Sequence, residues 1–350
     1  MLSYVFPGNI DPEIAAIGSK PIPYMRTAEF SAINLESEQI LLRLIHCNAG
    51  KTIIYTGSGT GAMSAVAENY ICTKKKAIVI NGGSFGRRWL SICRYYGIPT
   101  VNFEVPFTKD IDYDVLERTI AKERPDVFLC QHHETSSGVL YDLEKISGIC
   151  RKYDVPMVVD VISTFLAEEL DMDRLGIDIC ITSSQKGLNI PPGLSIVFLS
   201  SRLEGYKFAH NGYYWDFAEN LDNLRRGQTP FSPATTLYLQ LHARLKQIEA
   251  QGGGEALNIQ AIRHRAEIFR KECAKFGWAM PAEHPSSAIT AIQTADTGER
   301  KIFRGLIDNY ETFIMPGSRP GFYRISHMGL SSDHELAELA AHIHEFEPSK

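Results

Sequence analysis

A regular alternation of apolar runs with amphipathic stretches is the feature that most restricts the fold of this 350-residue chain. The apolar runs, rich in Val, Ile and Leu, lie at residues 76–82, 99–105, 126–132, 155–161, 177–183 and 194–200. Amphipathic stretches separate several of them, at 84–97, 113–123 and 142–154. Strands that are apolar throughout belong to a sheet buried on both faces, and single intervening helices favour parallel strands. The sequence therefore predicts an α/β fold with a mostly parallel central sheet flanked by helices.

Beyond about residue 250 the pattern changes. Three glycines at 252–254 precede a long helical pattern. The elements predicted after them are helices at 255–277, 299–309 and 333–346, strands at 287–293 and 322–328, and a Pro/Gly loop at 315–321. This mixture is typical of a smaller α+β domain. We therefore predict a large domain at 12–247 and a small domain made of 1–11 and 248–350.

The composition argues against several kinds of partner. A net charge of −5 and a pI near 6.1 give no electrostatic reason to expect nucleic acid or a membrane surface. The seven cysteines are odd in number and form no CxxC pair, which favours free thiols in a reducing compartment. No metal-ligand spacing, signal peptide or apolar run of ~18 residues is present, so we expect a soluble cytoplasmic protein without a metal site.

A glycine-rich turn, "YTGSGTGAM" at 55–63, lies between a short apolar strand and a helical pattern. It fits neither GxGxxG, because Ala62 fills the last position, nor a P-loop, because no GK[ST] follows. Small residues that open a helix leave backbone N–H groups free for an anion. We interpret Ser58, Gly59 and Thr60 as a cup for a single phosphate. An ordinary glycine-rich turn is the alternative.

Two charged residues follow predicted strands that are otherwise apolar. Asp160 ends the run "MVVD", where an unpaired carboxylate is costly to bury. Lys186 stands in "SSQKGL", just past the next run. A helix cap and a solvated loop lysine are the simpler interpretations. With the phosphate cup, however, the pair matches what pyridoxal 5′-phosphate (PLP) requires: an amine for its aldehyde and a carboxylate for its ring nitrogen.

The chain also resembles a known family. The motifs "GSGTGAM", "NGGSFGRR", "HHETSSG", "VVDVIST", "SSQKGL", "TPFSPAT" and "YRISHMG" are specific as an ordered set, and they extend over nearly the whole chain. In this order they are similar to the class V aminotransferases. These are fold-type I PLP enzymes, and the resemblance is greatest to alanine/serine–glyoxylate and 2-aminoethylphosphonate–pyruvate aminotransferases. The resemblance implies a transaminase that takes a small amino donor and a 2-oxo acid acceptor, with ping-pong kinetics.

The resemblance also implies a role for particular residues. Lys186 would carry the Schiff base and Asp160 would pair with the ring nitrogen. The other cofactor contacts implied are Ser58, Gly59, Thr60 and Gln185 at the phosphate, Phe85 and Ile162 on the two ring faces, and Thr135 at the ring edge. Arg324 would bind the substrate carboxylate. Phe85 and Ile162 as core residues, Thr135 as a turn cap and Arg324 as a surface ion pair are the competing interpretations.

Family members are dimers whose sites lie at the interface, so the resemblance implies a homodimer. The loop "QTPFSP" would reach the partner's phosphate through Thr229 or Ser232, and the sequence does not decide between them. Gly8 and Asn9 occupy the family's substrate-gating position. The donor and acceptor stay open, as does the presence of a phosphonate.

Two groups of alternatives remain at this stage. A PLP-dependent lyase or cysteine desulfurase would share the fold. Desulfurases of this superfamily typically carry a histidine directly before the lysine and a mobile late cysteine, whereas Gln185 precedes Lys186 and Cys273 lies in a predicted helix. A regulatory protein on this fold would most simply have lost the lysine or the aspartate. A Rossmann-type nucleotide-binding protein would need an acid after the strand that ends at Asn81.

Overall fold

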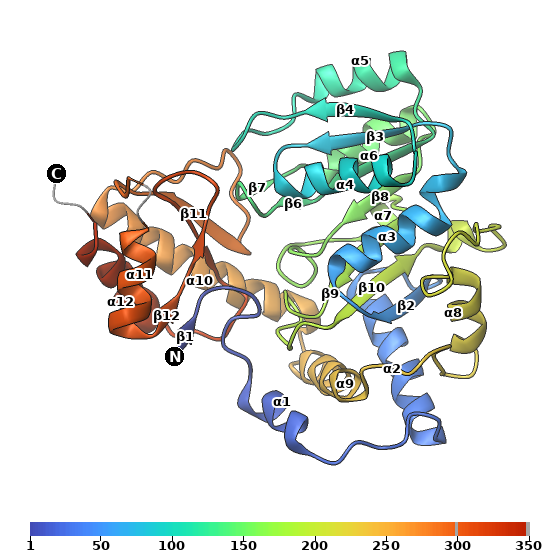
Figure 1. Cartoon of the computed structure of the whole chain (residues 1–350), viewed down its shortest axis with the longest axis horizontal. Helices are drawn as coiled ribbons and strands as arrows, with labels where there is room; N and C mark the ends of the chain where they lie inside the picture. Colours follow the sequence, from blue (N-terminus) through green and yellow to red (C-terminus); the bar gives the residue numbers. More distant parts are fainter. Residues whose placement is uncertain (298–299, 348–350) are drawn as a thin grey trace.

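The computed structural model describes residues 1–297 and 300–347. Its centre is a seven-stranded sheet (Figure 1). In spatial order the strands are β2 (Lys51–Thr56), β10 (Leu194–Leu199), β9 (Ile179–Ser183), β8 (Met157–Asp160), β5 (Val127–Gln131), β3 (Ala77–Asn81) and β4 (Thr100–Glu104). Every neighbouring pair is parallel except the two that involve β10, which is antiparallel to β2 and β9. The mostly parallel sheet predicted from the apolar runs is confirmed.

Both faces of this sheet are buried. Along β3, Ile78 and Ile80 belong to one apolar cluster and Val79 belongs to another, so alternate side chains pack on opposite faces. The helices that pack against the sheet are α2 (Ala28–Leu44), α3 (Gly59–Asn69), α4 (Ser84–Tyr95), α5 (Tyr113–Glu123), α6 (Leu143–Lys152) and α9 (Thr235–Ala250). This arrangement explains why the strand sequences are continuously apolar rather than alternating.

A second lobe contains the C-terminal part of the chain (Figure 1). Its antiparallel sheet contains β11 (Ile289–Gln293), β14 (Phe322–Ser326) and β13 (Met315–Pro316). Its helices are α10 (Gly254–Phe276), α11 (Lys301–Tyr310) and α12 (Asp333–Glu345). Residue 299, the predicted start of α11, lies outside the described residues. The N-terminal β1 (Leu2–Ser3) pairs in parallel with β12 (Thr312–Phe313), so the first residues join this lobe.

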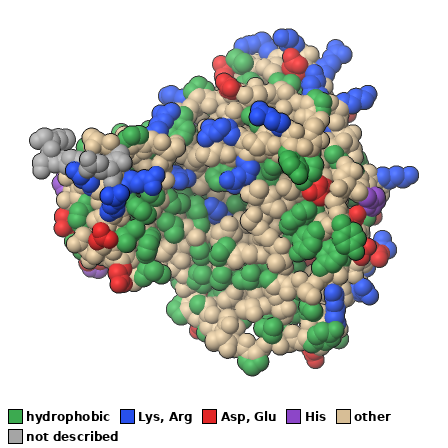
Figure 2. Space-filling view, in the orientation of Figure 1, with side chains coloured by type: hydrophobic (Ala, Val, Ile, Leu, Met, Phe, Trp, Pro, Cys, Tyr) green, Lys and Arg blue, Asp and Glu red, His purple; other side chains and the backbone are tan. Residues whose placement is uncertain are grey.

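Shorter elements complete the described structure. They are α1 (Pro12–Ala16), the hairpin of β6 (His133–Glu134) and β7 (Val139–Leu140), α7 (Met172–Leu175), α8 (Phe217–Leu224), and single 3-10 turns at 17–19, 71–73 and 201–203. None of the helices in residues 1–297 and 300–347 has the length and apolarity needed to cross a bilayer. Lys and Arg side chains gather on the half of the molecular face that carries α4 and α5 (Figure 2).

Candidate active site

Lys186 lies in a tightly fixed turn between β9 and β10. The amide of Asn189 donates to the Lys186 carbonyl at 2.8 Å, and the Ser184 hydroxyl donates to the Pro191 carbonyl at 2.8 Å. A Cβ atom on the next residue, Gly187, would lie 2.1 Å from the carbonyl oxygen of Phe165, so only glycine fits there. The backbone therefore holds the lysine in one place at the carboxyl edge of the sheet.

The lysine side chain is buried, with 7% of its surface exposed. Its Nζ lies 3.0 Å from the centroid of the Phe6 ring, which comes from the N-terminal segment. Burial lowers the pKa of Lys186 well below its usual range, whereas the nearby Asp160 carboxylate opposes that shift. Burial thus favours the neutral amine, which is the form that acts as a nucleophile or proton acceptor. Phe6 was not among the residues predicted for the site.

Asp160 lies at the end of β8, next to the strand that leads to Lys186, and is buried. Its Oδ1 accepts a hydrogen bond from the amide of Ile162 at 2.8 Å. Burial raises the pKa of Asp160 to about 7, and Glu134 adds to this, whereas Lys186 opposes it. No hydrogen bond to Oδ2 occurs within the described residues, so this oxygen is available to a bound cation or N–H donor.

The predicted phosphate cup lies at the beginning of α3. Ser58 is the N-cap residue and its side chain caps no backbone amide, which leaves the amides of Gly59 and Thr60 without partners in the described structure. A Cβ atom on Gly59 would lie 2.5 Å from Cδ1 of Ile162, so the helix start packs closely against that side chain. The buried Oγ of Ser183, nearby, also has no partner. These groups form a set of donors suited to an anion.

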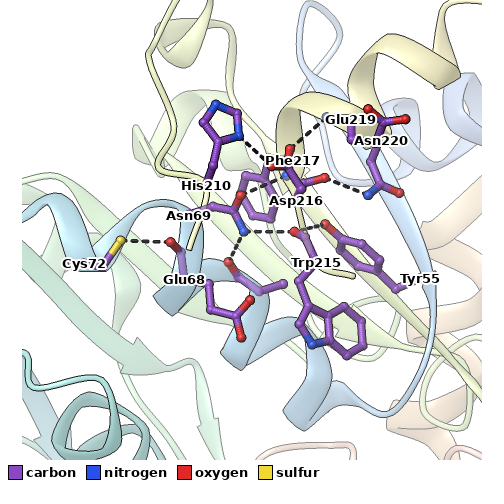
Figure 3. Close-up of polar contacts among 11 residues, drawn as sticks. Tyr55, Glu68, Asn69, Cys72, His210, Trp215, Asp216, Phe217, Glu219 and Asn220 are labelled. Carbon is purple, nitrogen blue, oxygen red and sulfur yellow. Dashed lines mark hydrogen bonds and ion pairs between the residues drawn. The ribbon is translucent and has the colours of Figure 1, made fainter. Parts of the chain in front are cut away.

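Trp215, drawn with its hydrogen-bond partners in Figure 3, packs against the glycine-rich turn, a contact that the sequence did not predict. Its carbonyl accepts hydrogen bonds from the Tyr55 hydroxyl at 2.8 Å and from Asn69 Nδ2 at 2.9 Å. Cβ atoms on Gly57 and Gly61 would lie 2.9 and 2.8 Å from Cη2 of the indole. Two glycines of "GSGTG" therefore make room for Trp215, and they are distinct from the residues proposed to meet the anion.

Phe85 is the second residue of α4, and a buried glutamate fixes its backbone. The Glu134 carboxylate accepts hydrogen bonds from the amides of Phe85 and Gly86, each at 3.2 Å. Gln131 Nε2 and the Ser136 hydroxyl also donate to it, at 2.9 and 2.5 Å. Glu134 thus satisfies the free N–H groups at the start of α4 and holds Phe85 at the edge of the sheet. Sequence reasoning gave this glutamate no role.

Thr135 and Arg324 meet between the two lobes. Thr135 Oγ1 lies 2.8 Å from Ser163 Oγ, which is also 2.9 Å from Nδ1 of His133. The Thr135 carbonyl accepts a hydrogen bond from Arg324 Nη1 at 3.0 Å. Burial lowers the pKa of His133 well below its usual range, so the imidazole is neutral. The sequence had predicted no acid–base role for this histidine.

Arg324, on β14, carries a charge without a carboxylate partner. Its two bonds run to carbonyl oxygens, those of Thr135 and of Pro316, the latter at 3.2 Å. Its Nε is buried and unpaired, and none of the described Asp or Glu residues forms an ion pair with it. Burial lowers its pKa, whereas Glu134 opposes that effect. A partly buried guanidinium without an anion is a binding position for a carboxylate or phosphonate.

The remaining predicted residues lie at the edges of the site. Gly8 has a φ of 84°, and a Cβ atom there would lie 2.6 Å from Cα of Gly329. The Asn9 side chain is occupied by two backbone groups, the Ser3 amide at 3.1 Å and the Leu330 carbonyl at 3.0 Å. Both residues hold the N-terminal segment against the small lobe. A substrate contact by either stays a prediction.

The loop at 229–232 and Gln185 complete the predicted set. Gln185 Oε1 is buried without a partner, one residue before Lys186. The Thr229 hydroxyl donates to the Phe231 carbonyl at 2.7 Å, and Ser232 is exposed. Among residues 1–297 and 300–347, no group of three or more His, Cys, Asp or Glu side chains is placed to hold a metal ion.

Comparison with known proteins identifies the family of this chain. Residues 24–212 match the family model described as aminotransferase class V. The soluble hydrogenase 42 kDa subunit of Anabaena cylindrica is 29% identical over 95% of this chain and 89% of its own. The L-aspartate–glyoxylate aminotransferase of Paracoccus denitrificans is 25% identical over 93% and 86%. The crystal structure of an alanine–glyoxylate aminotransferase from Nostoc sp. superposes with a TM-score of 0.90 at 22% identity, over 99% and 94%.

Proposed function

Because this chain belongs to the class V aminotransferase family, we propose that it moves an amino group from a small amino acid or aminophosphonate to pyruvate or glyoxylate. The protein is a PLP-dependent aminotransferase with the fold-type I architecture. The assignment of individual residues and of substrates is our proposal. The observation that carries it is the buried Lys186, whose pKa burial lowers, beside Asp160 at the edge of the sheet where the phosphate cup also lies.

The residues present fit PLP. The cofactor supplies an aldehyde for amines and a ring that withdraws electrons from the amino acid Cα. Ser58, Gly59 and Thr60 would hold its phosphate, with the unpaired Gln185 Oε1 beside the reactive lysine. Asp160, whose Oδ2 is free, would accept the N–H of the ring nitrogen. Phe85 and Ile162 would enclose the ring, and Thr135 would contact its edge.

Lys186 would act twice. Its amine, whose neutral form burial favours, would hold the cofactor through the aldehyde. When an amino donor takes that place, the freed amine would accept the Cα proton and then donate it, as a general base and acid. A cationic ring nitrogen would favour the ionised form of Asp160, because its charge would offset the cost of burying the carboxylate. The pair therefore supplies both proton transfer and charge stabilisation.

Arg324 would bind the anionic head of both substrates. It has a positive charge, two carbonyl contacts and an unpaired Nε, so a carboxylate completes its coordination. The relative from Paracoccus denitrificans is named for aspartate and glyoxylate, and the solved Nostoc relative for alanine and glyoxylate. These names support glyoxylate as an acceptor, with pyruvate as the second candidate.

A homodimer with sites at its interface is part of the proposal. Tyr213 and Tyr214 are exposed by 87% and 41%, and their rings lie 5.6 and 5.2 Å from that of Phe231. Clustered exposed aromatic side chains are typical of interaction surfaces. This cluster adjoins Thr229 and Ser232, so the same surface would bring one of these hydroxyls to the partner's phosphate.

The domain division and cellular location are also proposals. Pairing of β1 with β12 supports grouping residues 1–11 with 248–350, and the sheet with its helices supports a large domain at 12–247. All seven cysteines are free and six of them are buried, which supports a reducing compartment such as the cytoplasm.

A panel of amino donors tests the function. Purified enzyme is reconstituted with PLP, and its visible absorption is recorded as alanine, serine, aspartate or 2-aminoethylphosphonate is added. We expect at least one donor to bleach the band of the lysine-bound cofactor, and glyoxylate or pyruvate to restore it. Lys186→Ala is the control that should never show this band. A wild-type band that no donor bleaches would contradict the transaminase assignment.

A further inference from the structure

Arg88 connects two elements of the proposed cofactor site, although neither its sequence position nor the family comparison assigns it a role. Its Nη1 donates to Thr60 Oγ1 at 3.1 Å, from α4 to the start of α3. Its Cζ lies 5.0 Å from the centroid of the Phe85 ring, one turn earlier in the same helix. The guanidinium therefore contacts a residue proposed for the phosphate and the residue proposed for the ring face.

The bond to Thr60 determines what that hydroxyl can do. A guanidinium has only donors, so Thr60 Oγ1 must be the acceptor, and its own O–H is left free to donate elsewhere. Thr60 lies in the first turn of α3, where the adjacent Gly59 and Thr60 amides also lack partners. A phosphate at this position would only accept hydrogen bonds. The bond from Arg88 therefore orients the Thr60 hydroxyl so that its O–H can donate to the phosphate.

The positive charge of Arg88 is also free to attract an anion. It forms no ion pair with an Asp or Glu in the part of the chain that the structure describes. Its field reaches the reaction centre, because it lowers the pKa values of both Lys186 and Asp160. The neighbouring Arg87 differs: its hydrogen bond runs to Ser84 Oγ, at 3.2 Å, within its own helix.

We propose that Arg88 is a positioning residue for the cofactor phosphate, which fixes the Thr60 hydroxyl as a donor and adds positive charge at the mouth of the cup. The inference rests on the proposed assignment of the phosphate to Ser58, Gly59 and Thr60. A surface arginine that only stabilises the helix would affect folding and would not distinguish ligands with a phosphate from ligands without one. That difference makes the proposal testable.

The experiment compares PLP with pyridoxal, which lacks the phosphate, as ligands of the apo-enzyme. For Arg88→Gln we expect PLP to dissociate about tenfold more readily and pyridoxal affinity to change less than about twofold, because a hydrogen bond to a charged group is lost only for PLP. Arg87→Gln is the matched control and should change neither. Inorganic phosphate should compete with PLP for the wild type and compete more weakly for Arg88→Gln.

Equal PLP affinities of Arg88→Gln and the wild type would overturn the proposal, as would equal losses for PLP and pyridoxal. Thr60→Val combined with Arg88→Gln is a second measurement, and additive losses would also contradict it, because residues acting through one hydrogen bond are coupled. If Arg88→Gln does not fold, Arg88→Met, which keeps an unbranched side chain but has neither donor nor charge, serves for the same comparison of ligands with the same two outcomes. A wild-type enzyme that forms no visible band with PLP would instead refute the proposed function.

Discussion

Asp160→Asn separates two roles of the buried Asp160 carboxylate, its pairing with the cofactor and its effect on stability as the pH changes. Asparagine keeps an Oδ1 that can accept the Ile162 amide, so the bond at 2.8 Å is preserved. It removes the titrating group, whose pKa burial raises to about 7. We expect the variant to bind PLP more weakly, and yet to gain stability relative to the wild type as the pH rises in the absence of cofactor.

The magnitude follows from proton linkage. Between pH 3.8, the ordinary pKa of Asp, and about 7, the folded apo-enzyme keeps a proton on Asp160 that the unfolded chain has released. The free energy of unfolding therefore falls by about 1.4 kcal/mol per pH unit in this window, or about 4 kcal/mol in total, and levels off above about pH 7. Asparagine does not titrate, so the variant lacks this loss. An unpaired amide costs about 1–3 kcal/mol at every pH. The informative quantity is therefore how the difference in unfolding free energy between variant and wild type changes with pH.

Urea unfolding of both apo-proteins between pH 5 and pH 8 measures this. The stability difference should move in favour of Asp160→Asn by about 2 kcal/mol from pH 5 to pH 7 and approach a constant value by pH 8. Asp222→Asn, which removes an exposed carboxylate, is the control. With PLP bound the wild type should gain more stability than the variant, because the ring nitrogen pairs with the carboxylate. A difference that does not change with pH would refute the reasoning.

Three further outcomes are expected. Lys186→Ala should lower the transamination rate at least about a thousandfold, because it removes both nucleophile and base; mass spectrometry after borohydride reduction should find PLP attached to the wild type only, and attachment to the variant would contradict the assignment. Arg324→Gln should lower kcat/KM for carboxylate donors about 10–100-fold, as expected for a lost charged hydrogen bond, with PLP affinity preserved; a loss confined to PLP affinity would argue against substrate binding. Gly187→Ala, whose Cβ would meet the Phe165 carbonyl at 2.1 Å, should cost about 1–3 kcal/mol in thermal unfolding, and an unchanged melting temperature would show that the turn adapts.

The elements of the fold were predictable because their signals are local. The first four residues of "AIVIN", Ala77 to Ile80, are all apolar, so the run identifies a strand covered on both faces, and the structure places it in the sheet as β3. The pattern at 113–123 coincides with α5, whose N-cap Asp112 and preceding residues mark its beginning. Strand direction is a different matter. The turn between β9 and β10 contains no helix, and the antiparallel pairing of β10 depends on packing that no local pattern records.

The polar centres could be predicted from the sequence, whereas their surroundings could not. A charged residue after an apolar strand, such as Asp160, is costly to bury and therefore conspicuous. Phe6 and Trp215 are ordinary aromatic residues in the sequence, and they reach Lys186 and the phosphate cup only because distant segments fold together. Glu134 lies in the motif "HHETSSG", from which only Thr135 was predicted as a site residue. Glu134 accepts hydrogen bonds from backbone amides at the start of α4, and this role can be recognised only when the position of that helix is known.

The charges around the proposed site fit anionic ligands. Burial favours the neutral form of Lys186, and the Glu134 carboxylate accepts hydrogen bonds from the start of α4 and from Gln131 on β5. Arg324 and Arg88 are left without carboxylate partners in the described structure, at two different edges of the site. Two separated positive charges fit two separated anions, a phosphate at α3 and a substrate carboxylate or phosphonate between the lobes. Both arginines add to the effect of burial, which is the main reason that the pKa of Lys186 is lowered.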